Sequence, residues 1–294
     1  MRIGLYNNQK YDLSRGGPHT SSRRFRQSDA DTRAMSTLVI VLIIIIVVGV
    51  VAAVSLWWLW VGSENLITKE MAFSEFSKVE VGWAFDVEIG QSASYSVIII
   101  ADEYVEVSRT GEDEYERALT FDYISVSKTG DTLRIGLELG YNYRTAHTFR
   151  PLTLRAEITM PDLYQLRLSG ATHGTIEGFD FSHELNLSLS GASSLDIVNV
   201  STGDVAIELS GASNLDGNGI ANNLLIIASG ASHLELSDFP AHDANVILSG
   251  ASHATVNLDG RLDADVSGGS HLLYTGEPTL GDITTSGGST VERK

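Results

Sequence analysis

A five-residue phrase recurs along the C-terminal half of the chain at a nearly constant spacing. LSGAS occupies residues 189–193, 209–213 and 248–252, and LSGAT, ASGAS, VSGGS and TSGGS are related copies. The first serines of the seven copies are 18–21 residues apart, at Ser169, Ser190, Ser210, Ser229, Ser249, Ser267 and Ser286. A period of 20–50 residues indicates an architecture in which each unit stacks on the next. This period constrains the fold more than any other feature of the sequence.

Each copy also alternates between apolar and polar side chains. In residues 185–197, one face carries the apolar set Leu185, Leu187, Leu189, Leu195 and Ile197. This alternation is typical of a half-buried strand, whereas apolar residues at helical spacings are lacking. One unit cannot bury its apolar face alone, but stacked units cover each other. We therefore predict an all-β fold, a parallel β-solenoid with rungs of about 20 residues, over residues 161–294.

The glycine of each phrase is expected to lie in a corner between strands. Glycine suits a bend where a Cβ would clash or where φ is positive. The seven predicted corner glycines are Gly170, Gly191, Gly211, Gly230, Gly250, Gly268 and Gly287. The second Ser or Thr of each phrase is expected to form a hydroxyl ladder along the stack. A nucleophilic serine needs one positioned base, so seven similar copies favour a structural corner over a catalytic site.

Residues 73–160 are rich in strand-like segments but lack the repeated phrase. The predicted strands are 79–89, 95–100, 133–139 and 152–160, and the predicted loops or short helices are 111–117 and 140–149. We interpret 73–160 as an irregular β part of the same unit that caps or continues the solenoid. Residues 62–72 are predicted to be a short connector.

Residues 37–61 form a long apolar run, and no charged residue occurs from Ala34 to Ser63. About 20 apolar residues cross a bilayer, and the run is longer than the 7–15-residue core of a signal peptide. We therefore predict an uncleaved signal-anchor transmembrane helix. Residues 1–36 hold seven Lys or Arg and three Asp, so they are expected to be a cytoplasmic basic tail. The remainder would be extracytoplasmic, on a single-pass protein of the cell membrane.

The charge of the chain excludes some classes of partner. The formal net charge is −17, and no Lys or Arg occurs between Arg167 and Arg261. Phosphate backbones require cationic partners, so nucleic-acid binding by the repeat region is disfavoured. The chain has no cysteine, which excludes disulfides and thiolate metal sites.

Several segments in a fixed order resemble a known family. They are FSEFSKVEVGWAFDVEIGQ (73–91), SKTGDTLRI (127–135), ITMPDLYQLRLSGAT (158–172) and the repeated LSGAS. Through them, residues 73–294 resemble the head GIN-domain family of auto-transporter adhesins. The resemblance implies a right-handed β-helical fold at the cell envelope. The biochemical activity of that family is largely uncharacterised, so it implies no catalytic residues for this chain.

The position directly after each phrase is the strongest candidate for ligand chemistry. It holds His233, His253 and His271 in three consecutive copies, and Glu235 follows His233 on the same predicted outward face. Imidazole and carboxylate groups are metal ligands, so these residues could form a cation or ligand stripe. The alternative is a solvated polar ladder, because a flat row converges poorly on the tetrahedral geometry of zinc. No cofactor is predicted.

Two asparagines begin N-x-[ST] sequons on the proposed extracytoplasmic side. Asn186 and Asn199 are therefore possible N-glycosylation sites, provided that the host glycosylates proteins there.

Three functions remain open from the sequence. The favoured hypothesis is a non-enzymatic role in adhesion, binding or structure at the cell envelope, with envelope polysaccharide, divalent cations or neighbouring surface proteins as partners. The second is an envelope sensor that relays a signal to a cytoplasmic partner through residues 1–36. The third is a polysaccharide-active enzyme, which would need a localised cluster of acids and bases that the regular repeats lack.

Overall fold

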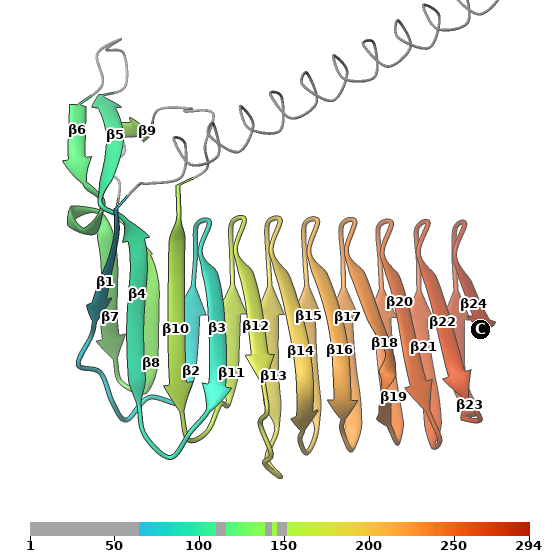
Figure 1. Ribbon diagram of the computed structural model, residues 1–294. Coiled ribbons are helices and arrows are strands. Elements are labelled where there is room, and N and C mark those ends of the chain that lie inside the picture. Colours follow the sequence, from blue (N-terminus) through green and yellow to red (C-terminus); the bar gives the residue numbers. More distant parts are fainter. Residues whose placement is uncertain (1–64, 110–115, 139–142, 146–151) are drawn as a thin grey trace, which may run out of the picture. The chain divides into compact units, whose positions relative to one another are not determined.

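The strands of the protein form two long sheets that lie against each other (Figure 1). The computed structural model describes residues 65–109, 116–138, 143–145 and 152–294. Sheet A contains, in spatial order, β1 (Leu66–Glu70), β4 (Ser96–Asp102), β10 (Leu154–Met160), β3 (Asp86–Gln91), β12 (His173–Glu177), β14 (Ser194–Ser201), β16 (Asn214–Ile220), β18 (His233–Ala241), β20 (His253–Leu258), β22 (His271–Gly276) and β24 (Thr290–Arg293). Sheet B contains β23 (Thr279–Thr285), β21 (Arg261–Val266), β19 (Asp243–Leu248), β17 (Asn223–Ala228), β15 (Val205–Leu209), β13 (Leu185–Leu189), β11 (Gln165–Leu168), β2 (Lys78–Val81), β8 (Thr132–Leu137) and β7 (Ile124–Thr129).

Each regular rung consists of one sheet B strand, a corner, one sheet A strand and a far turn. The chain runs from β13 through the corner 190–193 into β14, and then turns back into β15. Neighbouring strands of the repeat are parallel and in register, so that Leu195 pairs with Leu215. The predicted parallel β-solenoid is therefore confirmed. Its handedness stays a prediction.

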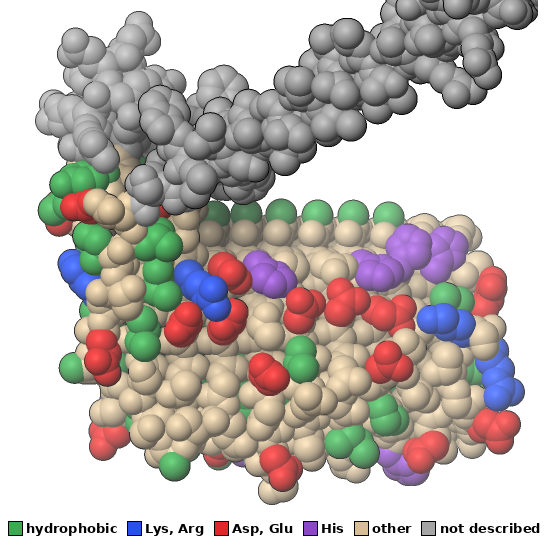
Figure 2. Space-filling view, in the orientation of Figure 1, with side chains coloured by type: hydrophobic (Ala, Val, Ile, Leu, Met, Phe, Trp, Pro, Cys, Tyr) green, Lys and Arg blue, Asp and Glu red, His purple; other side chains and the backbone are tan. Residues whose placement is uncertain are grey.

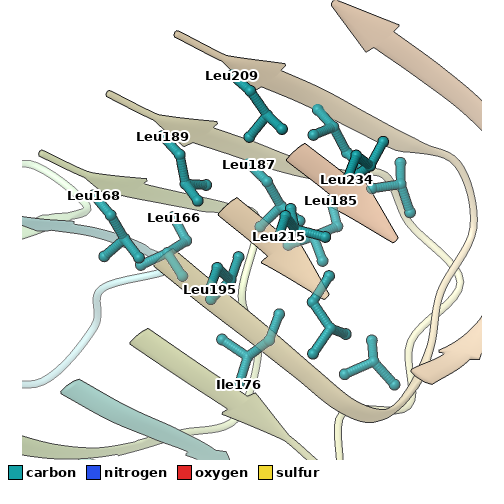
Figure 3. Close-up of a cluster of buried hydrophobic side chains, with 14 of the residues drawn as sticks. Leu166, Leu168, Ile176, Leu185, Leu187, Leu189, Leu195, Leu209, Leu215 and Leu234 are labelled. Atoms are coloured by element: carbon teal, nitrogen blue, oxygen red, sulfur yellow. The ribbon is translucent and has the colours of Figure 1, made fainter. Parts of the chain in front are cut away.

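The core lies between the two sheets and is built from the apolar positions that the alternation identified. Leu195, Leu215 and Leu234 stack on successive sheet A strands with none of their surface exposed. Sheet B supplies Leu168, Leu189 and Leu209 to the same cluster (Figure 3). Burial of each such leucine contributes about 1.5–3 kcal/mol, and the neighbouring rungs and the facing sheet together provide the cover.

The N-terminal part of the solenoid has an interleaved order. The rung formed by β2 and β3 lies between β11–β12 on one side and β8–β10 on the other. After β3 the chain therefore forms β8 and β10 on one side of the β2–β3 rung. It then crosses to the other side, where β11 and β12 begin the regular repeat. All four of these contacts are parallel ladders. The described strands β2, β3, β8 and β10 of residues 73–160 thus continue the solenoid at its N-terminal end.

Antiparallel strands form the edge of both sheets at the N-terminal end of the solenoid. β1 and β10 flank β4 in sheet A, and β7 pairs with β8 in sheet B. A small third sheet, sheet C, contains β6 (Glu116–Leu119), β5 (Tyr104–Arg109) and β9 (Tyr143–Thr145), and a 3-10 turn, η1 (Thr120–Asp122), follows β6. β1 lies within the segment 62–72, which was predicted to be a connector.

Residues 79–89 were expected to form one alternating strand, but the chain turns at 82–85, between β2 and β3. The predicted membrane span 37–61 and the tail 1–36 lie outside the described residues, as do most of the predicted loops 111–117 and 140–149. In the part of the chain that the structure describes, no helix is long and apolar enough to span a bilayer.

Candidate functional site

The three predicted histidines lie side by side on the outward face of sheet A. His233, His253 and His271 occupy paired positions on β18, β20 and β22. The ring centroids are 6.5 Å apart for the first pair and 5.0 Å apart for the second. His271 Nδ1 also lies 2.8 Å from the Thr290 hydroxyl on the next rung. The three histidines therefore occupy equivalent positions on successive rungs, as expected from the sequence period.

A second column, two residues further along each strand, carries carboxylates. Asp196, Asp216 and Glu235 pair in register on β14, β16 and β18 (Figure 2, in red, with the histidines in purple). Each has a local partner: His173 for Asp196, the Asn214 amide for Asp216, and the Ser237 backbone N–H for Glu235. Like charges on neighbouring strands repel one another, and these partners offset that repulsion.

The carboxylate of Glu235 is not placed to share a metal ion with the histidines. Burial raises the pKa of its carboxyl, but hydrogen bonds from Ser237 and Thr255, together with the charge of Lys294, outweigh burial and leave the pKa below its ordinary value. The carboxylate therefore stays ionised and is held by these groups. Within the described ranges, no group of three His, Asp or Glu side chains is placed to hold a metal ion.

The seven predicted glycines all lie in the corners that join sheet B to sheet A. Their φ angles are 74–80°, a conformation that side chains with a Cβ rarely adopt. Space is restricted as well, since a Cβ on Gly191 would lie 2.7 Å from the Gly170 carbonyl oxygen. The same oxygen accepts a hydrogen bond from the Ala192 N–H at 2.7 Å. Successive corners are therefore stacked too closely for any other residue.

The second Ser or Thr of the first six phrases is buried beneath its corner, and Ser289 of the last phrase is half-buried. Ser213 is 1% exposed, and its Oγ donates to the Ser210 carbonyl oxygen at 2.7 Å. Ser193, Ser232 and Ser252 make the equivalent bond within their own corners. A contact between hydroxyls of neighbouring rungs also occurs, at 3.5 Å between Ser193 and Ser213. The hydroxyls thus mainly close each corner, and the ladder between rungs is secondary.

One corner has no repeated phrase, and the sequence analysis missed it. Residues 82–85, GWAF, join β2 to β3 and stack on the corner of Gly170, since the Ala171 N–H donates to the Trp83 carbonyl at 3.1 Å. Trp83 occupies the position of the corner glycine and has a φ of 69°. Phe85 takes the place of the buried serine and is 1% exposed. Comparison of VEVGWAFDVEI with LSLSGASSLDI would have revealed the equivalence.

A cavity of about 320 Å³ opens on sheet B beside this corner. Its lining includes Trp83, Glu80, Arg134, Arg167, Ser169 and Ser190. Glu80 bridges the two arginines: its Oε2 lies 2.7 Å from Arg134 Nε, and its Oε1 lies 3.4 Å from Arg167 Nη1. An exposed indole, two guanidinium groups, a carboxylate and hydroxyls therefore meet at one place.

Both sequon asparagines are at the surface. Asn186 is half-buried on the outward side of β13, and Asn199 is exposed where the register of β14 shifts. Their glycosylation stays a prediction.

The comparisons with known proteins agree with this architecture. A family model described as "Putative auto-transporter adhesin, head GIN domain" matches residues 117–278, which is more than half of the chain. The chain belongs to this family. A search of the curated proteins found none that matches it.

Solved structures with the same fold come from Bacteroides and Parabacteroides species. A putative adhesin from Bacteroides fragilis has a TM-score of 0.66 and 20% identity, over 79% of this chain and 98% of that one. One from Parabacteroides distasonis has a TM-score of 0.61 and 15% identity, over 79% and 98%. A putative lipid binding protein from the same species has a TM-score of 0.56 and 15% identity, over 78% and 97%. At these identities the likeness establishes the fold alone.

Proposed function

We propose that this protein is a membrane-anchored ectodomain of the cell envelope that acts by binding, without chemical turnover, through the outward face of sheet A. The observation that carries the proposal is a row of polar side chains that continues from rung to rung: carboxylates on β14, β16 and β18, and histidines on β18, β20 and β22. Such a face presents the same kind of contact repeatedly along one axis. Membership of a family named for adhesins supports the same conclusion.

A repeated face suits a polymeric or multivalent partner. Each rung offers a weak contact, and the second and later contacts form at the high effective concentration set by the first. Envelope polysaccharides and divalent cations bound between polymer and protein have the required repetitive chemistry. An active site would instead concentrate its binding energy at one constellation of side chains.

The membrane anchor rests on residues 37–61 and on the basic tail before them. Protease added to intact cells should remove the solenoid and spare residues 1–36, as detected with antibodies to each part. A tail that is digested first, or a mature protein that starts after residue 61, would refute the anchor.

The binding role is tested by replacing His233, His253 and His271 with Ala singly, in pairs and together, in the full chain in detergent. We expect the affinity for envelope polysaccharide, measured with and without Ca²⁺, to fall stepwise while the melting temperature is unchanged. The matched control is His242→Ala, an exposed histidine in a far turn, paired with Asp259 and outside the column. Affinity that is unaltered in the triple variant would contradict the proposal, as would turnover of the polymer that one substitution abolishes.

A further inference from the structure

Trp83 combines two properties that rarely occur together. Its backbone is in the left-handed region, with a φ of 69°, although a bulky side chain is strained there. Its side chain is not used to fill the core, since the residue is 51% exposed. Strained conformations of this kind persist where the surrounding structure enforces them, and they gather at ligand sites.

The structure accommodates this tryptophan in a specific way. In the regular corners, the carbonyl oxygen of the preceding corner fills the space that a Cβ would need. The rung outside Trp83 is β8–β10, whose connecting segment contains β9 of sheet C instead of a four-residue corner. The indole then lies beside Gly136 of β8, where a Cβ would be 3.3 Å from Trp83 Cδ1. Gly136 therefore leaves room for the ring on the outer face of sheet B.

The polar groups around the indole are only partly used by the protein. Arg134 pairs with Glu80 through Nε, so its two terminal nitrogens have no partner among the described residues. Arg167 shares the same carboxylate and also contacts the amide oxygen of Gln165. Two guanidinium groups facing one carboxylate leave one positive charge. The site is therefore locally positive, although the chain has a formal net charge of −17.

We infer that the cavity at Trp83 is a binding site for an acidic saccharide. The C–H face of a sugar ring would stack on the indole, and the sugar carboxylate would pair with Arg134 and Arg167, because guanidinium groups bind carboxylates in a bidentate manner. Ser169, Ser190 and Glu80 would hydrogen bond to the sugar hydroxyls. A volume of about 320 Å³ is at the lower end of the range for small-molecule sites and suits one or two sugar units.

The residues that line the cavity favour a sugar over a lipid chain as the ligand. Its aliphatic members, Val81, Ile135 and Leu168, point into the core and are at most 3% exposed. The indole is then the principal apolar surface that a ligand meets, and one aromatic ring with a polar surround matches a sugar better than an acyl chain. The inference rests on the proposed function, because a binding role at the envelope would bring the protein into contact with such a saccharide. The site itself is separate from the histidine column, which is on the opposite sheet.

The test uses the full chain in detergent and an array that carries oligogalacturonate, oligoglucuronate and sialyllactose, with the methyl ester of oligogalacturonate as the uncharged counterpart. We expect at least one free acid to bind and its affinity to fall at least about tenfold in Trp83→Gly. Arg134→Gln and Arg167→Gln should remove the preference for free acid over ester. Trp83→Gly restores the residue found in the other corners, so the melting temperature should stay within about 3 °C of the parent. Ala84→Ser, at the neighbouring exposed position, should bind normally.

Three outcomes would overturn the inference: no acidic saccharide binds, Trp83→Gly binds as well as the parent, or phosphatidylglycerol vesicles bind at Trp83 in place of any sugar. Trp83 is the one tryptophan outside residues 37–61, so the difference in fluorescence between the parent and Trp83→Phe isolates its signal from that of Trp57, Trp58 and Trp60 and reports occupancy. The triple histidine variant separates the two proposals. If it loses polymer binding while Trp83→Gly does not, the saccharide site is wrong and the sheet A role stands; the reverse result leaves only the Trp83 site.

Discussion

The corner at Trp83 and the corner at Gly211 follow a similar backbone path but place opposite demands on the side chain. Gly211 is followed along the stack by further corners and preceded by Gly191, whose carbonyl closes the space beside its Cα. Among the described residues Trp83 is in the outermost corner of the row, and its indole lies beside Gly136 of β8. The comparison shows that glycine is required by stacking at least as much as by the φ angle. Where stacking stops, the same turn can present a large side chain.

The largest effect should follow from moving the tryptophan into the row. Gly211→Trp combines a positive φ with a clash against the neighbouring backbone, so we expect a loss of more than about 5 kcal/mol in the free energy of unfolding. Urea denaturation followed by far-UV circular dichroism measures it. Ala212→Ser, one residue away and exposed, is the control and should be nearly neutral. A small loss for Gly211→Trp would show that stacking does not exclude side chains.

The buried position of the first corner should be the next most sensitive. Phe85 fills the volume that a serine and its hydrogen bond occupy elsewhere, and it is 1% exposed. Phe85→Ala leaves a cavity and should lower the free energy of unfolding by about 3–5 kcal/mol. The same denaturation experiment tests this. A loss below about 1 kcal/mol would mean that Phe85 is not an integral part of the core.

The equivalent change in a regular corner should be smaller. Ser213→Ala removes the hydroxyl that donates to Ser210, and a hydrogen bond of this type contributes about 1 kcal/mol. Thermal unfolding of the parent and the variant checks the value. If Ser213→Ala were as damaging as Phe85→Ala, the hydroxyl would have a further role in joining rungs.

The smallest effect on stability is expected for Trp83→Gly. Relief of backbone strain, about 1–3 kcal/mol, should offset the loss of packing by a half-exposed indole, so the net change is within about 1 kcal/mol of zero. Calorimetry on the variant decides this. A large loss would show that the tryptophan is retained for the fold, and it would remove a main reason to assign it a ligand.

The sequence predicted the regular half of the molecule well because the same signal is repeated there. The spacing of the phrase placed the corners at Gly170 to Gly287, and one inward-outward alternation then located the histidine column. When the repeat sets the register between strands, the register can be predicted without knowing which distant parts of the chain are in contact. For this reason, the pairing of His233 with His253 and His271 could be foreseen.

The irregular half could not be predicted in the same way. In GWAF the glycine comes first and the residue with positive φ is Trp83, which backbone preferences alone would exclude from that position. The segment therefore resembles an uninterrupted strand. The interleaving of β2–β3 between β8–β10 and β11–β12 depends on pairings between strands far apart in the chain, and no local pattern encodes them. The cavity at Trp83 requires both features, so it is visible only in three dimensions.

The interleaved rung also determines how the solenoid responds to mechanical tension. A force applied through the chain before residue 66 first meets β1, which is held on one side by β4 and can be peeled away one residue pair after another. The next element along the chain is β2, followed by β3, and each of these is clamped between two parallel neighbours. Extracting that rung requires both flanking ladders to break together. A molecule pulled from this end would therefore yield easily at β1 and then resist, so that the chain before β2 lengthens before the stacked rungs are disturbed.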